Sequence, residues 1–273
     1  MQGNKIDLLY QWLSVVYILD MKRFFLILVM LLITLPAVAQ DLRMLFWYPG
    51  EAGSAEDAQP VLDAFFEYLS TKLNDSKITG IYENSSERGL RYVQTQKPAL
   101  ILASHAAYIQ SNHVFNGGEN YLTTLPYPKR KAVEIFYLVS LEKEIGPNSV
   151  VYTSQPMTWD YLVKEFDWNL PKSVNIITTP NLFTKLKFIG QGKEKAFAIL
   201  TPIERYALKN LKMDWAKKID IVLASKEIPA PKIRTFSAVP PELRDVLIKM
   251  SKDKEGKEIL HELRLAGFGE IKK

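Results

Sequence analysis

The chain has 273 residues and no cysteine, so no disulfide can stabilise it and each folded unit must rely on its own hydrophobic core. Its 35 Lys and Arg against 30 Asp and Glu give a formal net charge of +5, spread along the chain. Nucleic-acid-binding proteins cluster their basic residues, so the composition argues against a nucleic acid as partner. The length suits one large or two small α/β lobes.

The first forty residues predict export. Lys22 and Arg23 precede an apolar run at 24–35, and Pro36 with the small residues 37–39 follows. This order is typical of a secretory signal peptide, and the run is shorter than the roughly 20 apolar residues of a membrane span. The alternative is a retained N-terminal anchor.

We therefore expect translation to start at Met21 and residues 1–39 to comprise an upstream extension and a signal peptide cleaved after Ala39. The mature protein would start at Gln40 and lie in a periplasm. No cysteine follows the signal to carry a lipid, which favours a free protein over a lipoprotein.

The first part of the mature chain predicts a parallel sheet. Apolar strands alternate with helical patterns, and such alternation is typical of parallel sheets with right-handed crossovers. Ligands of these sheets bind at the carboxyl ends of strands, so the loops after Tyr48, Tyr82 and Ala103 indicate a candidate site. The strands are expected at 42–48, 77–82 and 98–103, with a helix capped by Ser54 and another starting near 84–87.

The pattern weakens between 112 and 130, and a second, smaller α/β unit is predicted beyond it. Its strands are expected at 133–141, 149–153, 174–178, 196–200 and 219–224, with helices at 158–166 and 181–189. A further strand is expected at 232–237. The C-terminal part predicts helices from Pro241 onward, with Gly256 as an interruption and Gly267 at a helix C-terminus.

Three stretches carry a resemblance to a known family. The strongest is the tail, 239–270, where a proline-led helix precedes a Gly, an Ile-Leu pair and a closing Gly-Phe. The others are the strand, loop and helix ending in FFEYLSTKLN and the stretch SERGLRYVQTQKPALILASHAAYI. In this order they resemble the periplasmic phosphate/phosphonate-binding proteins of ABC transporters, within the type 2 periplasmic binding protein superfamily.

The resemblance implies an α/β fold of two lobes joined by a two-stranded hinge, with a ligand cleft between them. Lobe 1 would comprise 40–124 and 203–273, and lobe 2 would comprise 125–202. The function implied is binding of a small anionic solute and its presentation to the permease of an ABC transporter, by a protein that acts as a monomer. The chain departs from the family at the turn TSQPMT and in strand 196–200, which lacks an acidic residue.

Two residues of the TSQPMT turn, Ser154 and Thr158, are expected as ligand donors, because hydroxyls and backbone N–H groups at a helix N-terminus bind oxyanions. The alternative for Thr158 is a helix cap only. Ser104 and His105 follow the third strand. Helix capping is again the alternative for Ser104, and a histidine at the surface or with its hydrogen bonds satisfied within the protein is the alternative for His105.

Tyr48 is expected to wall the cleft, with core packing as its alternative, whereas Trp47 should face the core. Thr201 and Glu204, after strand 196–200, would lie at the cleft or hinge.

No catalytic, metal-binding or cofactor-binding residue is predicted. The three histidines lack ligand spacing with Asp or Glu, and no phosphate-binding glycine loop or nucleophile motif is present. The main hypothesis is that the chain is a binding protein and not an enzyme. Three alternatives stay open: a sensing module for a membrane receptor, an interaction module without a ligand, and an enzyme with dispersed residues on the same fold.

Overall fold

The computed structural model describes residues 41–50, 54–74, 76–127 and 130–271. The predicted extension and signal peptide at 1–39 lie outside these residues. Among the residues described, none of the helices combines the length and the apolar character needed to cross a bilayer.

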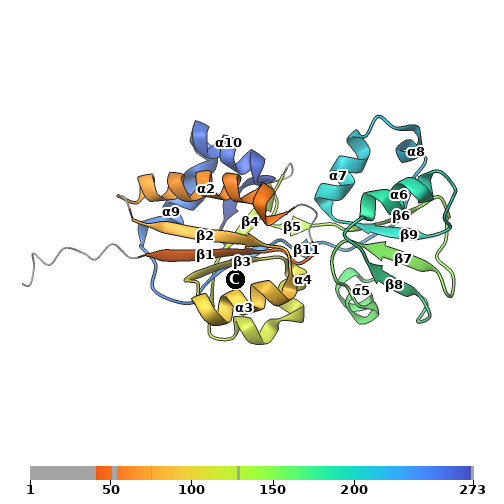
Figure 1. Ribbon diagram of the computed structural model, residues 1–273, viewed down its shortest axis with the longest axis horizontal. Coiled ribbons are helices and arrows are strands. Elements are labelled where there is room, and N and C mark those ends of the chain that lie inside the picture. Colours follow the sequence, from red (N-terminus) through yellow and green to blue (C-terminus); the bar gives the residue numbers. More distant parts are fainter. Residues whose placement is uncertain (1–40, 51–53, 75, 128–129, 272–273) are drawn as a thin grey trace, which may run out of the picture. The chain divides into compact units, whose positions relative to one another are not determined.

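The first sheet has six strands in the order β13-β4-β12-β3-β1-β2 (Figure 1). The three strands expected from the opening of the chain pair in parallel, as predicted, and the other three join the sheet through antiparallel pairs. Their bounds are β1 (Leu42–Trp47), β2 (Ile78–Glu83), β3 (Leu100–Ala103), β4 (Glu119–Pro126), β12 (Lys232–Thr235) and β13 (Leu265–Gly269).

Alternation along β1 divides the first core into two layers. Leu42, Met44 and Phe46 face one cluster, whereas Leu45 and Trp47 face the other. Trp47 is fully buried, as predicted. Figure 1 shows the helices on the two sides of the sheet. One side carries α2 (Ala55–Lys72), α9 (Glu242–Lys249), the 3-10 turn η2 (Met250–Lys252) and α10 (Lys254–Glu262), and the other carries α3 (Ser86–Gln96), α4 (His105–Gln110) and the 3-10 turn η1 (Asn112–Phe115).

Two features of this sheet differ from the sequence prediction. Strand β4 lies where the pattern weakened, and it is held by pairing with β12 and β13, which are remote in sequence. Gly267 does not end a helix. Helix α10 ends at Glu262, and Arg264, two residues later, has a left-handed φ of 58°. Gly267 belongs to β13, where the pairing with β4 shifts in register.

The second sheet has five strands in the order β10-β6-β9-β7-β8. Helix α5 covers one face, and three helices cover the other. The strands are β6 (Tyr137–Ser140), β7 (Val150–Thr153), β8 (Asn175–Thr178), β9 (Phe197–Leu200) and β10 (Asp220–Ala224), and the helices are α5 (Trp159–Phe166), α6 (Leu182–Gly190), α7 (Pro202–Asn210) and α8 (Asp214–Lys217).

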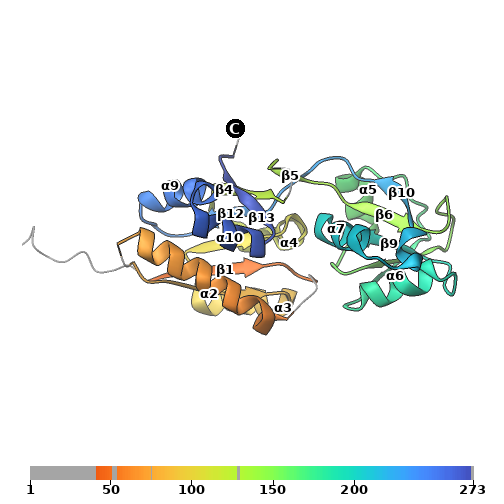
Figure 2. The same ribbon diagram turned by 90° about the horizontal axis from the view of Figure 1, so that it is seen from above.

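A pair of short antiparallel strands connects the two sheets. β5 (Val133–Glu134) leads into the second sheet (Figure 2), and β11 (Ile228–Pro229), labelled in Figure 1, leads out of it. The single strand expected at 133–141 is thus divided into β5 and β6. The fold is two α/β lobes with a two-stranded connection, as predicted.

The sheets do not divide at the lobe boundaries expected from the sequence, after 124 and after 202. β4 continues to Pro126 in the first sheet, and β10 pairs with β6 in the second. Antiparallel pairing between distant segments decides this division, and such pairing leaves no mark in the local sequence pattern.

Candidate functional site

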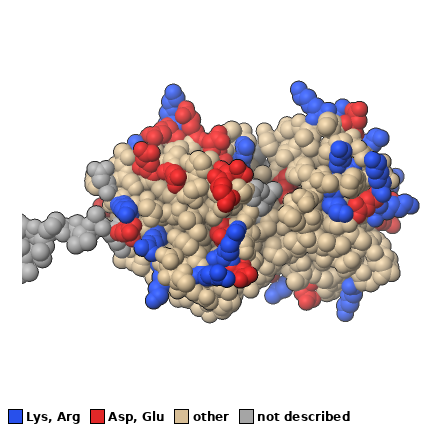
Figure 3. Space-filling model, viewed as in Figure 1, with Lys and Arg blue, Asp and Glu red and all other residues tan. Residues whose placement is uncertain are grey.

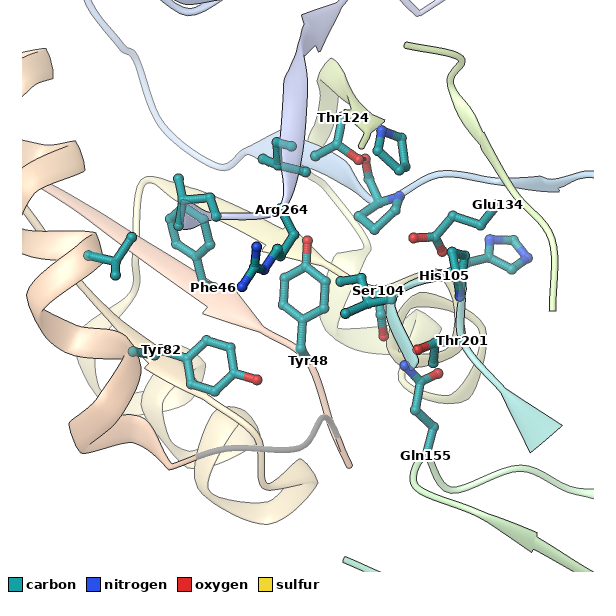
Figure 4. A pocket seen from close by; sticks show the side chains of 18 of the residues that line it. Phe46, Tyr48, Tyr82, Ser104, His105, Thr124, Glu134, Gln155, Thr201 and Arg264 are labelled. Atoms are coloured by element: carbon teal, nitrogen blue, oxygen red, sulfur yellow. The ribbon is translucent and has the colours of Figure 1, made fainter. Parts of the chain in front are cut away.

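A cavity of about 370 Å³ lies where the two lobes face each other, at the carboxyl ends of β1, β2 and β3 (Figure 4). The sequence pointed to these strand ends. Residues from both lobes and from the connecting strand β5 line it. Those used below are Phe46, Tyr48, Asp57, Ala58, Val61, Leu62, Tyr82, Ser104, His105, Glu134, Gln155, Thr201, Ile203, Glu262, Leu263, Arg264 and Leu265.

Aromatic residues from adjacent parallel strands wall the first-lobe side. Tyr48 follows β1 and Tyr82 lies near the end of β2, and their rings stack with centroids 6.4 Å apart at 17°. Phe46 pairs with Tyr82 across the strands. Tyr48 therefore lies in the cavity wall, the place expected of it.

Ser104 combines the two roles considered for it. It caps α4, and its Oγ accepts a hydrogen bond from the Ala107 N–H at 3.2 Å. The residue is buried and also lines the cavity. Its hydroxyl hydrogen remains able to point toward a ligand.

His105 lies at the junction between the lobes. Its Nε2 is 3.6 Å from Glu165 Oε2 of α5, beyond hydrogen-bond distance, and its ring centroid is 6.4 Å from that of Tyr161. Burial lowers the pKa of His105 below its usual value, and the nearby Glu165 opposes this shift without overcoming it. The shift favours the neutral imidazole over the cation at the cavity.

Thr201 supplies the corresponding helix start in the second lobe. It caps α7 in a capping box, where Glu204 N–H donates to Thr201 Oγ1 at 3.2 Å and Thr201 N–H donates to Glu204 Oε2 at 2.8 Å. Thr201 and Ile203 line the cavity. The capping box thus fixes the start of α7 against the cavity.

Ser154 lies behind this wall and is absent from the cavity lining. Its side chain hydrogen-bonds the carboxyl of Glu204, which is buried. Burial raises the pKa of Glu204, and the hydrogen bonds from Thr201 and Ser154 oppose that shift. In this structure the Ser154 side chain binds the Glu204 carboxyl, and a direct contact of Ser154 with a ligand stays a prediction.

Thr158 also lies outside the lining. It is exposed and caps α5 by accepting a hydrogen bond from the Tyr161 N–H at 3.2 Å, the alternative considered for it. The structure therefore brings Tyr48, Ser104, His105 and Thr201 together, but not Ser154 or Thr158.

Sequence reasoning missed several lining residues. Gln155 is the buried member of the TSQPMT turn that reaches the cavity, and Figure 4 shows it beside Thr201. Glu134 belongs to the connecting strand β5, and Arg264 is the left-handed residue that follows α10. Only the departure of the TSQPMT turn from the family pattern could have drawn attention to Gln155. The other two depend on tertiary structure.

The charges of the lining are mixed. Asp57, Glu134 and Glu262 are acidic, and Arg264 is basic. Among the described residues, Arg264 forms no ion pair, and no three His, Asp or Glu side chains are grouped as a metal ion requires.

No family model matches the chain, and no curated protein matches it. Solved structures do match, at low identity. A binding protein component of an ABC phosphonate transporter from Pseudomonas aeruginosa has a TM-score of 0.60 at 12% identity, covering 84% of this chain and 82% of that chain. PhnD1 from Prochlorococcus marinus, in complex with methylphosphonate, has a TM-score of 0.64 at 11% identity, covering 85% and 93%.

XAC2383 from Xanthomonas citri, solved with ATP bound, has a TM-score of 0.62 at 10% identity, covering 85% of this chain and 92% of that chain. Identities this low establish architecture, and all three likenesses extend over both lobes. Together with the two sheets, the two-stranded connection and the cavity between the lobes, they show that this chain has the type 2 periplasmic binding protein fold, as the resemblance implied.

Proposed function

We propose that this protein is an extracytoplasmic solute-binding protein that holds a small phosphate- or phosphonate-like anion between its lobes. The observation that carries the proposal is the cavity itself, which is built from strand ends and helix starts of two lobes connected by two short strands. Such a connection permits hinge closure around a ligand.

Neutral hydrogen-bond donors would hold the anion. Ser104, Gln155 and Thr201 converge on one end of the cavity (Figure 4), and α7 presents its N-terminus there. Hydroxyls, amides and the positive end of a helix dipole stabilise oxyanions without a cationic side chain. A neutral His105 is compatible with this type of recognition.

Several contacts already link the lobes. The Gln110 side chain donates to the Pro156 carbonyl, and a Cβ placed on Gly50 would lie 2.6 Å from Gln155 Cα. These contacts border the cavity, so ligand binding and lobe closure would support each other. We propose that the closed form is read by a membrane partner in the cytoplasmic membrane, either an ABC permease or a sensor.

The proposal includes export of residues 40–273 to the periplasm as a monomer that acts in transport without catalysis. Fractionation of the native host tests the location, and mass spectrometry of the mature N-terminus tests cleavage after Ala39. Light scattering of the purified protein tests the monomer.

Calorimetric titration with phosphate, phosphite, methylphosphonate and sulfate measures whether each anion binds and with what Kd. In a thermal melt, an anion present at about 100 times its Kd should stabilise the fold by about 2.7 kcal/mol and raise Tm by several degrees. Ser104→Gly removes the hydroxyl but keeps an acceptable helix cap, and should weaken binding about tenfold.

Ser85→Gly is the matched control, because Ser85 caps α3 in the same way and lies outside the cavity lining. Its affinity should equal that of the unaltered protein. Failure of every oxyanion to bind would contradict the anion proposal and favour a sensing or interaction module.

A further inference from the structure

The cavity extends beyond the meeting point of the lobes into the first lobe. In Figure 4, Ser104, Gln155 and Thr201 lie at one end, whereas Phe46, Tyr82 and Arg264 lie toward the other. We call this second end the side chamber. Its apolar wall is formed by Phe46 of β1, by residues of α2, and by residues that follow α10, namely Ala58, Val61, Leu62, Leu263 and Leu265.

The side chamber reaches the hydrophobic core. Phe46 is 4% exposed, Leu62 is 1% exposed, and both belong to the core cluster under α2 and α10, together with Leu265. Side chains of this kind offer no hydrogen bond to water, and cavities lined by them favour apolar occupants.

The cavity is also larger than an oxyanion requires. Its volume of about 370 Å³ falls in the range of pockets for organic ligands, about 300–1,000 Å³. On the same scale one water needs about 10–15 Å³, so a phosphate-like group the size of two or three waters takes about 20–45 Å³. Most of the space therefore remains for another part of the ligand.

Charge alone does not orient such a ligand, because both ends of the cavity carry carboxylates. Figure 3 shows acidic side chains gathered over α2 and α10, and Asp57 and Glu262 of these helices line the cavity together with Arg264. Figure 4 shows Glu134 beside His105, toward the end formed by Ser104, Gln155 and Thr201. The neutral donors of that end and the N-terminus of α7, and not the charges of the lining, would hold the anionic group there.

We propose that the solute is an oxyanion with a hydrocarbon substituent, alkyl or aryl, whose apolar part fills the side chamber between α2 and β13. The position of the anionic group rests on the function proposed above. The apolar part rests on the wall of the side chamber alone, so the two can be tested apart.

Titration with methyl-, butyl- and hexylphosphonate tests the proposal in the unaltered mature protein. Each buried methylene should tighten binding about fourfold, so butylphosphonate, with three more methylenes, should bind about 60-fold more tightly than methylphosphonate. The neutral apolar dye N-phenyl-1-naphthylamine, which has no anionic group, should bind and be displaced by hexylphosphonate.

Ala58→Phe fills the side chamber from α2 and should remove the chain-length preference and dye binding while leaving methylphosphonate affinity within twofold. Ala64→Phe is the control, because Ala64 is exposed on the same helix and lies outside the lining of this cavity. A melting curve confirms that both variants fold. Val61→Phe repeats the test from a second position.

The outcomes separate the two proposals. Equal affinity for all three phosphonates, together with no dye binding, overturns the side-chamber inference but leaves the anion proposal intact. Dye binding that Ala58→Phe abolishes, with no phosphonate bound, supports an apolar occupant and overturns the oxyanion end. Loss of dye binding in Ala64→Phe as well overturns the side-chamber location.

Discussion

His105 Nε2 lies 3.6 Å from Glu165 Oε2, and this pair joins the first helix after β3 to the first helix after β7. The two side chains are 13% and 21% exposed. Ala106, next to His105, packs in the core of the second lobe although α4 belongs to the first. Helix α4 therefore contributes to both lobes, and substitutions of its side chains should be sensitive to the contact between the lobes.

Acid should destabilise the protein through His105. Burial makes the pKa of His105 lower in the folded protein than its ordinary value of 6.5, so the unfolded chain binds this proton more tightly. The free energy of unfolding should fall as the pH drops below about 6.5, by at most about 1.4 kcal/mol per pH unit. The neighbours that bear on this group are Glu165, Tyr161 and Lys232.

His105→Gln should flatten this pH dependence, measured by urea unfolding between pH 5 and 8. His261→Gln is the control, since the His261 side chain is 57% exposed. An unchanged slope in His105→Gln would show that another group controls acid stability.

Gly50→Ala should weaken ligand binding by at least tenfold. Gly50 has a φ of 79°, and its added Cβ would meet the backbone of Ser154 and Gln155 in the other lobe. The methyl group would push the lobes apart at the edge of the cavity. Gly117→Ala carries the same left-handed strain at a φ of 87° without any atom within 4 Å.

Titration calorimetry separates the two glycine variants. Gly117→Ala should lose only about 1 kcal/mol of stability and keep its affinity. Small-angle scattering should show a larger radius of gyration for Gly50→Ala. Equal affinity in both variants would contradict a role for the contact at Gly50 in closure.

Ser154→Ala should act on stability first. The substitution removes a hydrogen bond to the buried Glu204 carboxyl, which costs about 1–3 kcal/mol and lowers Tm by about 2–12 °C. In a Glu204→Gln background the same change should cost less, because a neutral amide needs less compensation in the interior. Additive losses in the double variant would refute this coupling.

Thr158→Ala should reduce stability by about 1 kcal/mol, the usual value of a lost N-cap. Ligand affinity should not change, because Thr158 is exposed and lies outside the cavity lining. Thermal melting and titration of the same sample measure both quantities. A tenfold loss of affinity would instead restore the ligand role expected from sequence.

The sequence by itself determined the elements whose pattern is local. Alternation along β1 placed Trp47 in the core, and the strand–helix alternation predicted the parallel order of β1, β2 and β3 and the loops that line the cavity. These features follow from side-chain period and chain connectivity, both of which can be read over short windows.

Tertiary structure alone decided which residues meet. β4 is a strand because β12 and β13 pair with it, and the boundary between the lobes follows the pairing of β10 with β6. Arg264, from the opposite end of the chain, comes near Tyr48 because this left-handed residue lies between the end of α10 and the start of β13 (Figure 4). Contacts between distant segments depend on register and packing, for which a local pattern carries no information.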